Sequence, residues 1–539
     1  MNSEEPHVEK SRVIRSAFLI GSFTLLSRGL GLVRDFLTAG FFGTSLAMSA
    51  FVVAFRIPNL FRALFGEGAL SSAFIPVFMA TRKNEGDPAA WVLARKVISL
   101  VGLVLLGLVL VGLAGITLAM HRPDLGARTA MILPLARIML PYMLFICLAA
   151  LSMAILNSYH QFAIPASTPS LLNLTWIAFI LLVVPHIDGP PEAQIYGVAW
   201  AVFCAGIVQL LYQFPALFHY GYRPGFQLDL KDARVMRVFT LMGPSALGLA
   251  VTQVNVMVNS LLAVWIGSWA PAALFYAERL LYFPQGILAT AMSTVLLPVL
   301  SGHAAHARHQ EIRETINHSL RTLLFVMAPA SIGLLALAHP IVQMIFEWGR
   351  FTQSSTNLTA IALQFYAPGL FVFCLAKVFV PAFYALQDTR TPVKIGLICV
   401  AVNFTLNVLF ILTWPLYYKH AGLALATVIS EGFNGITLAL FLRKRLGPLG
   451  LKSILLTVLR ALSASMAMGL AVFFIRSSLY TFFLQIGLLA KMAQVGSVLL
   501  AILLGGLIYL AMARIFKFPE LNDVIQAVRQ RRQRKRPAS

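Results

Sequence analysis

The sequence predicts an all-α polytopic membrane protein. About 14 transmembrane helices form two pseudo-symmetric six-helix lobes around a central cavity, and two further helices follow at the C-terminus. Of the 539 residues, 59% are hydrophobic and only 12% are charged, whereas about a quarter of the residues in a soluble domain are charged. The apolar residues occur in long stretches, and part of the first half recurs in the second. A soluble globular fold is therefore excluded.

The predicted helices follow from these apolar stretches, because roughly twenty such residues cross the hydrocarbon core of a bilayer. The stretches cover residues 13–38, 43–80, 94–120, 129–157, 163–185, 194–218, 237–266, 270–303, 314–339, 356–387, 392–413, 420–442, 454–476 and 490–515. The second, eighth and tenth are too long for straight helices perpendicular to the membrane. We expect these three to tilt, kink or protrude.

The connections between the helices alternate in basic content. The even connections carry basic residues, such as Arg82 and Lys83, whereas the odd connections are poor in lysine and arginine. Basic loops stay in the cytoplasm, so both termini are expected there. The predicted segments are a cytoplasmic leader (1–12), an N-lobe (13–218), a cytoplasmic linker (219–236), a C-lobe (237–442), two further helices (443–515) and a basic cytoplasmic tail (516–539).

An internal repeat underlies the two predicted lobes. Pro76 has a counterpart in Pro298, and Pro141, Cys147 and Pro165 recur at a constant offset as Pro368, Cys374 and Pro392. Because each lobe has an even number of helices, both enter from the cytoplasm and form parallel repeats, which typically enclose a central cavity near the midplane. Chance similarity between apolar helices is the alternative explanation.

Several function classes are excluded by what the sequence lacks. It contains no Walker A, HExxH or GxSxG motif and no cluster of paired carboxylates, so we expect a transporter and not an enzyme. The four cysteines lie in apolar segments without CxxC spacing, which predicts neither disulfides nor a metal site. The net charge of +22 is distributed as membrane topology requires, and no nucleic-acid recognition motif accompanies it. No nucleic-acid partner is expected.

Four arginines in the first two apolar stretches are the most informative residues. Arg28 and Arg34 lie in the first stretch, and Arg56 and Arg62 lie in the second. An arginine at the centre of a bilayer costs about 2.5–3.5 kcal/mol, so four of them require roughly 10 kcal/mol of compensation. They either form structural ion pairs or face an anionic ligand. We place Arg62 in the cavity and leave Arg56 unassigned.

Three acidic residues accompany these cations. Asp35 can neutralise Arg28 or Arg34, and Glu67 lies beside a helix break, where it can reach solvent. In the second lobe Glu278 adjoins Arg279, which is the repeat counterpart of the arginines in the second stretch. We assign the acids to ion pairing or gating. Guanidinium groups suit phosphate, because their planar fork donates two parallel hydrogen bonds and stays charged when desolvated.

Other polar residues within the apolar stretches leave two interpretations open. Asn255, Asn259, Asn403, Thr405 and Asn407 can coordinate a cation or form hydrogen bonds between helices. Lys377 can extend to the membrane surface, pair with an acid or contact a substrate.

The motifs SRGLGLVRD, AFVVAFRIPNLFRALFGEGALSSAFIP, YAERLLYFPQG followed by LLPVLS, and ALQDTRTP resemble the MurJ (MviN) family of lipid II flippases. This family belongs to the multidrug/oligosaccharidyl-lipid/polysaccharide (MOP) exporter superfamily. The resemblance covers essentially the whole chain. It implies transport of lipid II, the undecaprenyl-pyrophosphate-linked disaccharide-pentapeptide, from the inner to the outer leaflet of the bacterial inner membrane for peptidoglycan synthesis.

The resemblance also implies roles for individual residues. The substrate-binding arginines of the family correspond to Arg28, Arg34, Arg62 and Arg279, and residues 454–515 would hold the polyprenyl tail. The sodium site of the family corresponds to Asn259, Asn403, Asn407 and Thr427, which lack its carboxylates. Ser49 and Tyr282 also stand where relatives carry acids. Coupling is therefore expected from sodium or from the membrane potential, which is worth about 2.3 kcal/mol per charge per 100 mV.

The expected partners are lipid II, membrane lipids and cell-wall synthesis proteins, with the protein itself a monomer and no bound cofactor. Three alternatives remain open at this point: a flippase for another polyprenyl-linked glycan, a MATE-like drug exporter, and a non-transporting membrane scaffold for cell-wall enzymes. A drug exporter would need carboxylates in its cavity, whereas this sequence supplies arginines.

Overall fold

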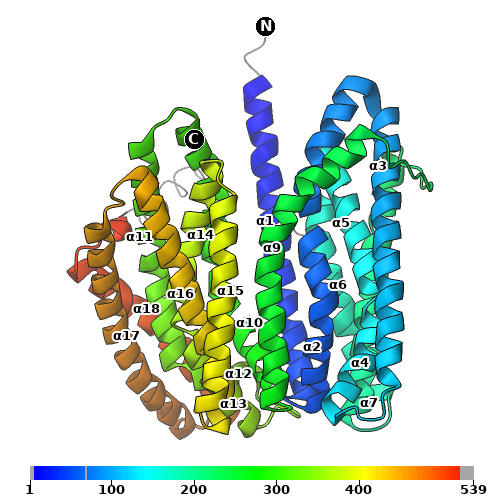
Figure 1. The fold of residues 1–539 in the computed structure, drawn as a ribbon. Coiled ribbons are helices and arrows are strands. Elements are labelled where there is room, and N and C mark those ends of the chain that lie inside the picture. Colours follow the sequence, from blue (N-terminus) through cyan, green and yellow to red (C-terminus); the bar gives the residue numbers. More distant parts are fainter. Residues whose placement is uncertain (1–4, 67–68, 523–539) are drawn as a thin grey trace, which may run out of the picture. The chain divides into compact units, whose positions relative to one another are not determined.

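The computed structural model describes the backbone of residues 5–66 and 69–522. Within these ranges, the side chains of residues 5–18, 66, 69, 244, 245, 247, 287–291, 293 and 294 are outside the description. Every regular element among the described residues is a helix, which confirms the all-α class (Figure 1). The chain divides into two compact units, each described below by itself.

The first unit comprises Met1–Ala272 together with Trp348–Phe351. Its helices are α1 (Glu5–Phe42), α2 (Leu46–Phe61), a π-helical turn (Arg62–Gly66), α3 (Ala69–Met120), α4 (Ala127–Met139), α5 (Tyr142–Ser158), α6 (Ala163–Leu182), a 3₁₀ turn (Val184–His186), α7 (Pro191–Leu211), α8 (Phe214–His219) and α9 (Ala233–Ile266). Helix α3 is kinked at Gly86, whose φ of 87° is outside the helical region. The kink separates the second and third predicted stretches.

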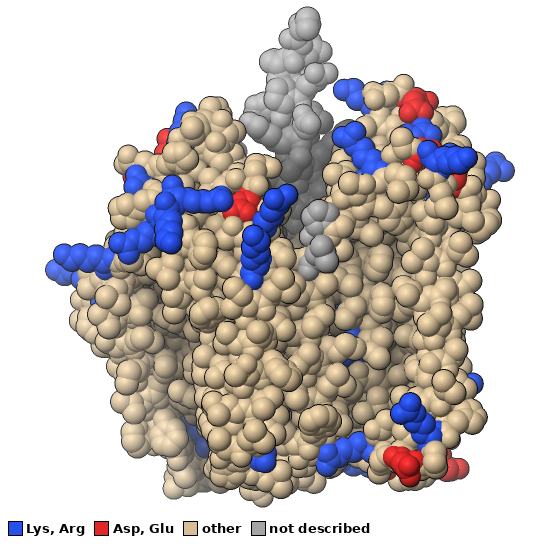
Figure 2. Space-filling view, in the orientation of Figure 1, with Lys and Arg blue, Asp and Glu red and all other residues tan. Residues whose placement is uncertain are grey.

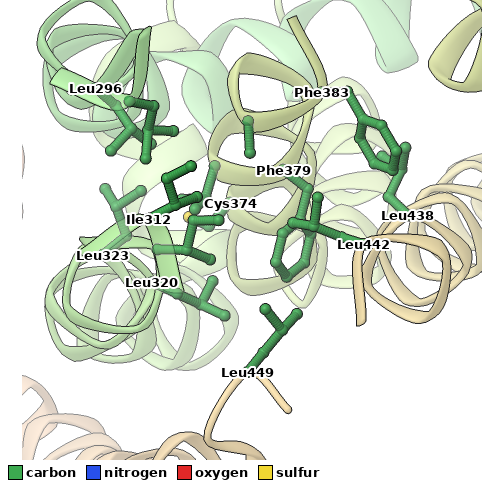
Figure 3. Packing of buried hydrophobic residues seen from close by; sticks show 14 of the residues in the cluster. Leu296, Ile312, Leu320, Leu323, Cys374, Phe379, Phe383, Leu438, Leu442 and Leu449 are labelled. Carbon is green, nitrogen blue, oxygen red and sulfur yellow. The ribbon is translucent and has the colours of Figure 1, made fainter. Parts of the chain in front are cut away.

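The second unit comprises Ala273–Glu347 and Thr352–Ser539. Its helices are α10 (Ala270–Ala305, which begins in the first unit), α11 (His309–Ala336), α12 (Ala338–Phe346), α13 (Gln353–Tyr366), α14 (Gly369–Ala385), α15 (Arg390–Thr413), a 3₁₀ turn (Leu416–Tyr418), α16 (Lys419–Leu446), α17 (Leu451–Gln485) and α18 (Ala490–Ile515). Figure 3 shows its core, where Leu320 and Leu323 of α11 lie beside Cys374 and Phe379 of α14. Cys374 is a packed core residue.

By length and composition, ten helices of the described residues are able to cross a membrane, or eleven when the bent pair α13–α14 counts as one span. One of the ten is the broken range Leu46–Met120, which contains two predicted stretches. All 14 predicted stretches coincide with a helix or a pair of helices, but the count of 14 crossings stays a prediction. On the face in Figure 2, lysine and arginine side chains gather near the two ends of the helices. The protein is thus a multi-pass membrane protein.

Two of the three over-long stretches are broken. The second is interrupted by the π-helical turn Arg62–Gly66, and the tenth divides into α13 and α14 at a bend of 46°. The α13–α14 break has a counterpart at α4–α5 in the first unit. Pro368 directly precedes α14, as Pro141 directly precedes α5. Because proline cannot donate a backbone hydrogen bond, it is suited to the start of the second helix of each pair. This equivalence supports the internal repeat, although the boundaries of the two lobes stay predictions.

The C-terminal end of α1 packs tightly against the tetrapeptide Trp348–Phe351 of the same unit. The indole of Trp348 donates from Nε1 to the carbonyl of Phe36 at 2.9 Å and stacks on its ring at a centroid distance of 4.8 Å. The backbone N–H of Arg350 donates to the carbonyl of Gly40 at 2.7 Å. A Cβ on Gly40 would overlap the Trp348 ring, so only glycine permits this approach.

An ionic cluster ties the linker before α9 to α3. The Lys96 ammonium lies 2.8 Å from a carboxylate oxygen of both Asp229 and Asp232. Arg234 pairs with Asp232 at 2.8 Å and with Glu85 at 2.6 Å. The hydrogen bond from Arg234, with help from Lys96, holds the pKa of Asp232 well below its usual range despite the opposing effect of burial.

The segment after α18 returns to the second unit through Glu520, which is 1% exposed. Its Oε1 accepts from Nε of Arg321 at 2.7 Å and from the hydroxyl of Thr457 at 3.3 Å. The segment that follows α18 is thereby fixed to α11 and α17 by a buried, charge-assisted contact.

Candidate substrate-binding site

Arg34 and Asp35 form a buried ion pair within α1. Arg34 is 7% exposed and Asp35 is 4% exposed. Nε and Nη2 of Arg34 donate to Asp35 Oδ1 at 2.9 and 2.7 Å. Of the two pairings open to Asp35 from the sequence, the structure has the one with Arg34. In the described conformation this guanidinium is therefore committed to protein partners.

Two residues of α6 complete the surroundings of Arg34. Nη1 of Arg34 donates to Asn173 Oδ1 at 3.0 Å, and the guanidinium carbon lies 4.6 Å from the ring centroid of Trp176. Asn173 also donates from Nδ2 to the carbonyl of Ser27 at 2.9 Å, so it joins α6 to α1 at two levels. Sequence reasoning missed both residues. The sequence contains one indication of them. Asn173 precedes Trp176 by three residues in an apolar stretch, and this spacing places both side chains on one face of a helix.

Arg28 is in a different situation from Arg34. It lies six residues earlier on α1, about 120° away in projection, and it is half-buried. Among the described residues it has neither a hydrogen bond nor an ion pair. Its positive charge is thus available to a ligand, which is the condition that the anion-binding interpretation requires.

Arg56 of α2 and Arg62 lie on either side of an irregular part of the chain. Pro58 interrupts the hydrogen bonding of α2, and the π-helical turn begins at Arg62. Nε of Arg62 donates to Asn59 Oδ1 at 2.9 Å, and Nε of Arg56 donates to Ser260 Oγ of α9 at 3.0 Å. Single π-helical turns occur frequently at functional sites, so the location of Arg62 agrees with a binding role. Glu67 lies outside the described residues.

The second unit contributes Arg279 and Glu278, both half-buried on α10. The guanidinium carbon of Arg279 lies 4.5 Å from the ring centroid of Phe275. Glu278 Oε1 accepts from the hydroxyl of Tyr366 on α13 at 3.3 Å. This hydrogen bond links α10 to α13. The sequence predicted a role in ion pairing or gating for Glu278.

The predicted ion-site residues of the second unit form a hydrogen-bonded network between α15 and α16. Asn403 and Asn407 are fully buried, and Nδ2 of Asn407 donates to Asn403 Oδ1 at 2.8 Å. Nδ2 of Asn403 donates to Ser430 Oγ at 3.3 Å, and Ser430 donates to the carbonyl of Thr427 at 3.0 Å. Asn259 belongs to the first unit.

The donor set of this network suits a cation only in part. Its amide and hydroxyl oxygens are ligand types that hard cations accept, but Asn403, Asn407 and Thr427 supply no carboxylate, and Asn403 Oδ1 already accepts a hydrogen bond. The described residues contain no group of three or more His, Cys, Asp or Glu side chains placed to hold a metal ion. The network therefore fits an interhelical contact better than a strong sodium site.

Glu431 is an intramembrane acid that sequence reasoning missed. It lies near the middle of α16, and its Oε2 accepts from Asn434 Nδ2 at 3.1 Å. Lys377, near the middle of α14, is exposed and acts electrostatically on Glu431. The sequence does indicate Glu431, because a single carboxylate within an apolar stretch is expected to be functional or paired.

Comparisons with known proteins identify the family. A family model described as "Lipid II flippase MurJ" matches residues 38–493. The lipid II flippase MurJ of Burkholderia cenocepacia is 36% identical over 449 residues, which cover 80% of this chain and 84% of that protein. A solved structure of lipid II flippase MurJ in an inward closed conformation is 27% identical with a TM-score of 0.73, and the match covers 94% of this chain and all of that one.

A more distant structure extends the likeness in fold. An inward-facing MATE family transporter of the MOP superfamily matches with a TM-score of 0.67 at 14% identity, over 80% of this chain and 98% of that one. At this identity the match concerns the fold alone. The family model and the relative from Burkholderia confirm the resemblance carried by the sequence motifs. This chain belongs to the lipid II flippase MurJ family.

Proposed function

We propose that this protein is a lipid II flippase of the bacterial inner membrane, with both termini in the cytoplasm. It moves the undecaprenyl-pyrophosphate-linked peptidoglycan precursor from the inner to the outer leaflet by alternating access. Membership of the MurJ family supports the substrate, since the relatives carry that name. A flippase of this kind is a transporter and catalyses no covalent step.

The observation that carries the proposal is Arg28. Its guanidinium lies within an apolar helix without a hydrogen bond or ion pair from any described residue, while the nearby Arg34 is fully engaged. A charge left in this state is costly in a membrane, and a phosphate offsets the cost through bidentate hydrogen bonds. We assign contact with the pyrophosphate to Arg28, Arg62 and Arg279. Arg34 positions α1 through Asp35 and Asn173.

The lipid tail of the substrate is proposed to stay in the bilayer along α17 and α18. Both helices carry exposed apolar side chains, among them Leu459 (55% exposed), Phe474 (67%) and Leu503 (66%). The cost of exposing such surface to water indicates that hydrocarbon covers it. A polyprenyl chain can therefore slide along these helices while the polar headgroup crosses the membrane. Other lipids of the membrane cover the remaining apolar surface.

We propose the membrane potential as the main driving force. The network of Asn403, Asn407 and Thr427 lacks carboxylates, which weakens the case for sodium. The potential acts on the mobile positive charges with about 2.3 kcal/mol per charge per 100 mV. Flipping measured in proteoliposomes should respond to a potassium diffusion potential. A response to a sodium gradient alone would favour sodium coupling.

The test of substrate binding is Arg28→Ala in proteoliposomes that report lipid II flipping. The expected loss is about tenfold or more, because a charge-assisted hydrogen bond is worth on the order of 1.5–3 kcal/mol. Arg28→Lys should retain part of the activity, since lysine keeps the charge but lacks the planar fork. Arg122→Ala is the matched control, an exposed arginine in the connection between α3 and α4. Wild-type flipping by Arg28→Ala would contradict the proposal.

Two further experiments separate the alternatives. Competition by other polyprenyl-linked sugars against lipid II distinguishes a flippase for another glycan. Rescue of a flippase-depleted bacterium by Arg28→Ala would indicate a scaffold that recruits cell-wall synthesis proteins without transport. Sedimentation of the purified protein tests the expected monomer.

A further inference from the structure

A groove of about 460 Å³ opens on the first unit between α3, α4 and α7. Leu113 and Met120 of α3 line it together with Trp200 and Phe203 of α7. Its volume is within the range of sites that hold small molecules, about 300–1,000 Å³. Trp200 is 49% exposed, and other large apolar side chains on these two helices are exposed as well. In a membrane protein such surface faces lipid, so the groove opens to the bilayer.

The charged residue in the lining of this groove is Arg137 of α4. Its side chain is exposed, and it has no hydrogen bond or ion pair within the described part of the chain. The other lining side chains are apolar or aromatic. An arginine in such surroundings requires an anionic partner or contact with the headgroup region. Arg137 has no place in the proposed translocation mechanism, so its partner must be found separately.

The depth of Arg137 indicates what it can reach. The span Ala127–Ser158 has 32 residues and is about 48 Å long, some 18 Å more than the hydrocarbon core. Arg137 lies about 15 Å along it from Ala127. With the excess length shared equally by the two ends, Arg137 is about 6 Å inside the hydrocarbon boundary. An arginine side chain spans that distance by extending toward the surface.

We propose that the groove binds one anionic glycerophospholipid of the outer leaflet. Its phosphate accepts hydrogen bonds from Arg137, and its upper acyl chain lies against Trp200 and Phe203. Charge complementarity selects this occupant, because one unpaired guanidinium at the head of an apolar groove matches a single negative headgroup on hydrocarbon chains. On the predicted topology Ala127 is at the outer surface, which fixes the leaflet. The site is separate from the path proposed for lipid II.

The test is native mass spectrometry of the full-length protein titrated with phosphatidylglycerol, with zwitterionic phosphatidylethanolamine as the comparison lipid. Arg137→Gln should weaken phosphatidylglycerol binding about fivefold, as expected for one basic residue at an anionic lipid. Arg122→Gln removes the same charge at the same end of the helices but outside the groove. This control should bind phosphatidylglycerol like the wild type.

A second variant guards against misfolding. Arg137→Lys retains the charge, so it should retain most of the preference for phosphatidylglycerol over phosphatidylethanolamine. Equal weakening in Arg137→Gln and Arg122→Gln would overturn the proposal. Equal binding of phosphatidylglycerol and phosphatidylethanolamine by the wild type would also overturn it. Displacement of the bound lipid by a co-purifying membrane protein would do the same. Flipping of lipid II is measured in parallel, and unchanged flipping by Arg137→Gln keeps this site distinct from the translocation path.

Discussion

Replacing Asp35 by asparagine should destabilise the first unit, because Asp35 is the counter-charge of a buried arginine. Arg34 donates two hydrogen bonds to Asp35 at 2.9 and 2.7 Å and one to Asn173 at 3.0 Å. At 7% exposure it cannot regain contact with water when its partner becomes neutral. Removing one partner of a buried ion pair costs about 3–5 kcal/mol. The contact with Trp176 offsets only a small part of that loss.

The assay is a double-mutant cycle on purified protein, with unfolding in a denaturing detergent followed by circular dichroism. Arg34→Gln and Asp35→Asn each remove one charge of the buried pair, whereas the double variant removes both. The double variant should therefore be more stable than the sum of the single losses predicts, by about 1–3 kcal/mol. As a control, Asp35→Asn combined with Arg122→Gln should be additive within about 0.5 kcal/mol, because no contact described for either residue joins the two.

Additive losses in the Arg34/Asp35 cycle would refute the assignment of a structural ion pair. Flipping by the same double variant tests the function of Arg34. If Arg34 only positions α1, a double variant with recovered stability should also recover part of its flipping activity. A stable double variant without any flipping would place Arg34 in contact with the substrate instead.

Three other outcomes are expected. Gly40→Ala should lower stability by about 1–3 kcal/mol, measured by thermal unfolding, because its Cβ would overlap the Trp348 ring, whereas Gly29→Ala meets nothing within 4 Å and should be tolerated. Glu520→Gln should lower the free energy of unfolding by about 1.5–3 kcal/mol, because Arg321 loses its counter-charge. The control is Glu311→Gln, which should lower it by under about 1 kcal/mol, because the pair of Glu311 with Arg308 is exposed. The pKa of Asp232 is lowered in the folded protein, so its stabilising effect is complete above the ordinary aspartate pKa of about 3.9 and is lost as the pH falls below that value. Melting temperatures between pH 7 and pH 3 should fall less steeply for Asp232→Asn than for the wild type.

Local signals in the sequence predicted most of the helices. Apolar length located all 14 stretches. The sequence identified Pro141 and Pro368 as repeat counterparts, and the structure shows that two equivalent stretches divide there. Length alone could not show which residues break the second stretch. Pro58 has no backbone N–H to donate, and the π-helical turn at Arg62–Gly66 depends on how the surrounding backbone adjusts to that missing hydrogen bond.

The partners of the candidate site were harder to predict. Asp35 was identified as a partner for an arginine because it is close in sequence. Asn173 and Trp176 were not, because they are about 140 residues away from Arg34 and only the packing of α6 on α1 brings them together. Glu431 was missed for a different reason, since it lies far along the chain from the arginine-rich stretches.

The spacing along α1 explains why Asp35 pairs with Arg34 and not with Arg28. Asp35 lies seven residues from Arg28, which is about 10.5 Å along the helix axis, although the two point to nearly the same side. It is adjacent to Arg34 and forms its ion pair with that residue. A single acid therefore secures the helix against α6 through Arg34 and cannot also neutralise Arg28. The same helix thus combines the buried Arg34, which holds its position, with Arg28 about 1.7 turns away, which has no ion pair among the described residues and can bind phosphate.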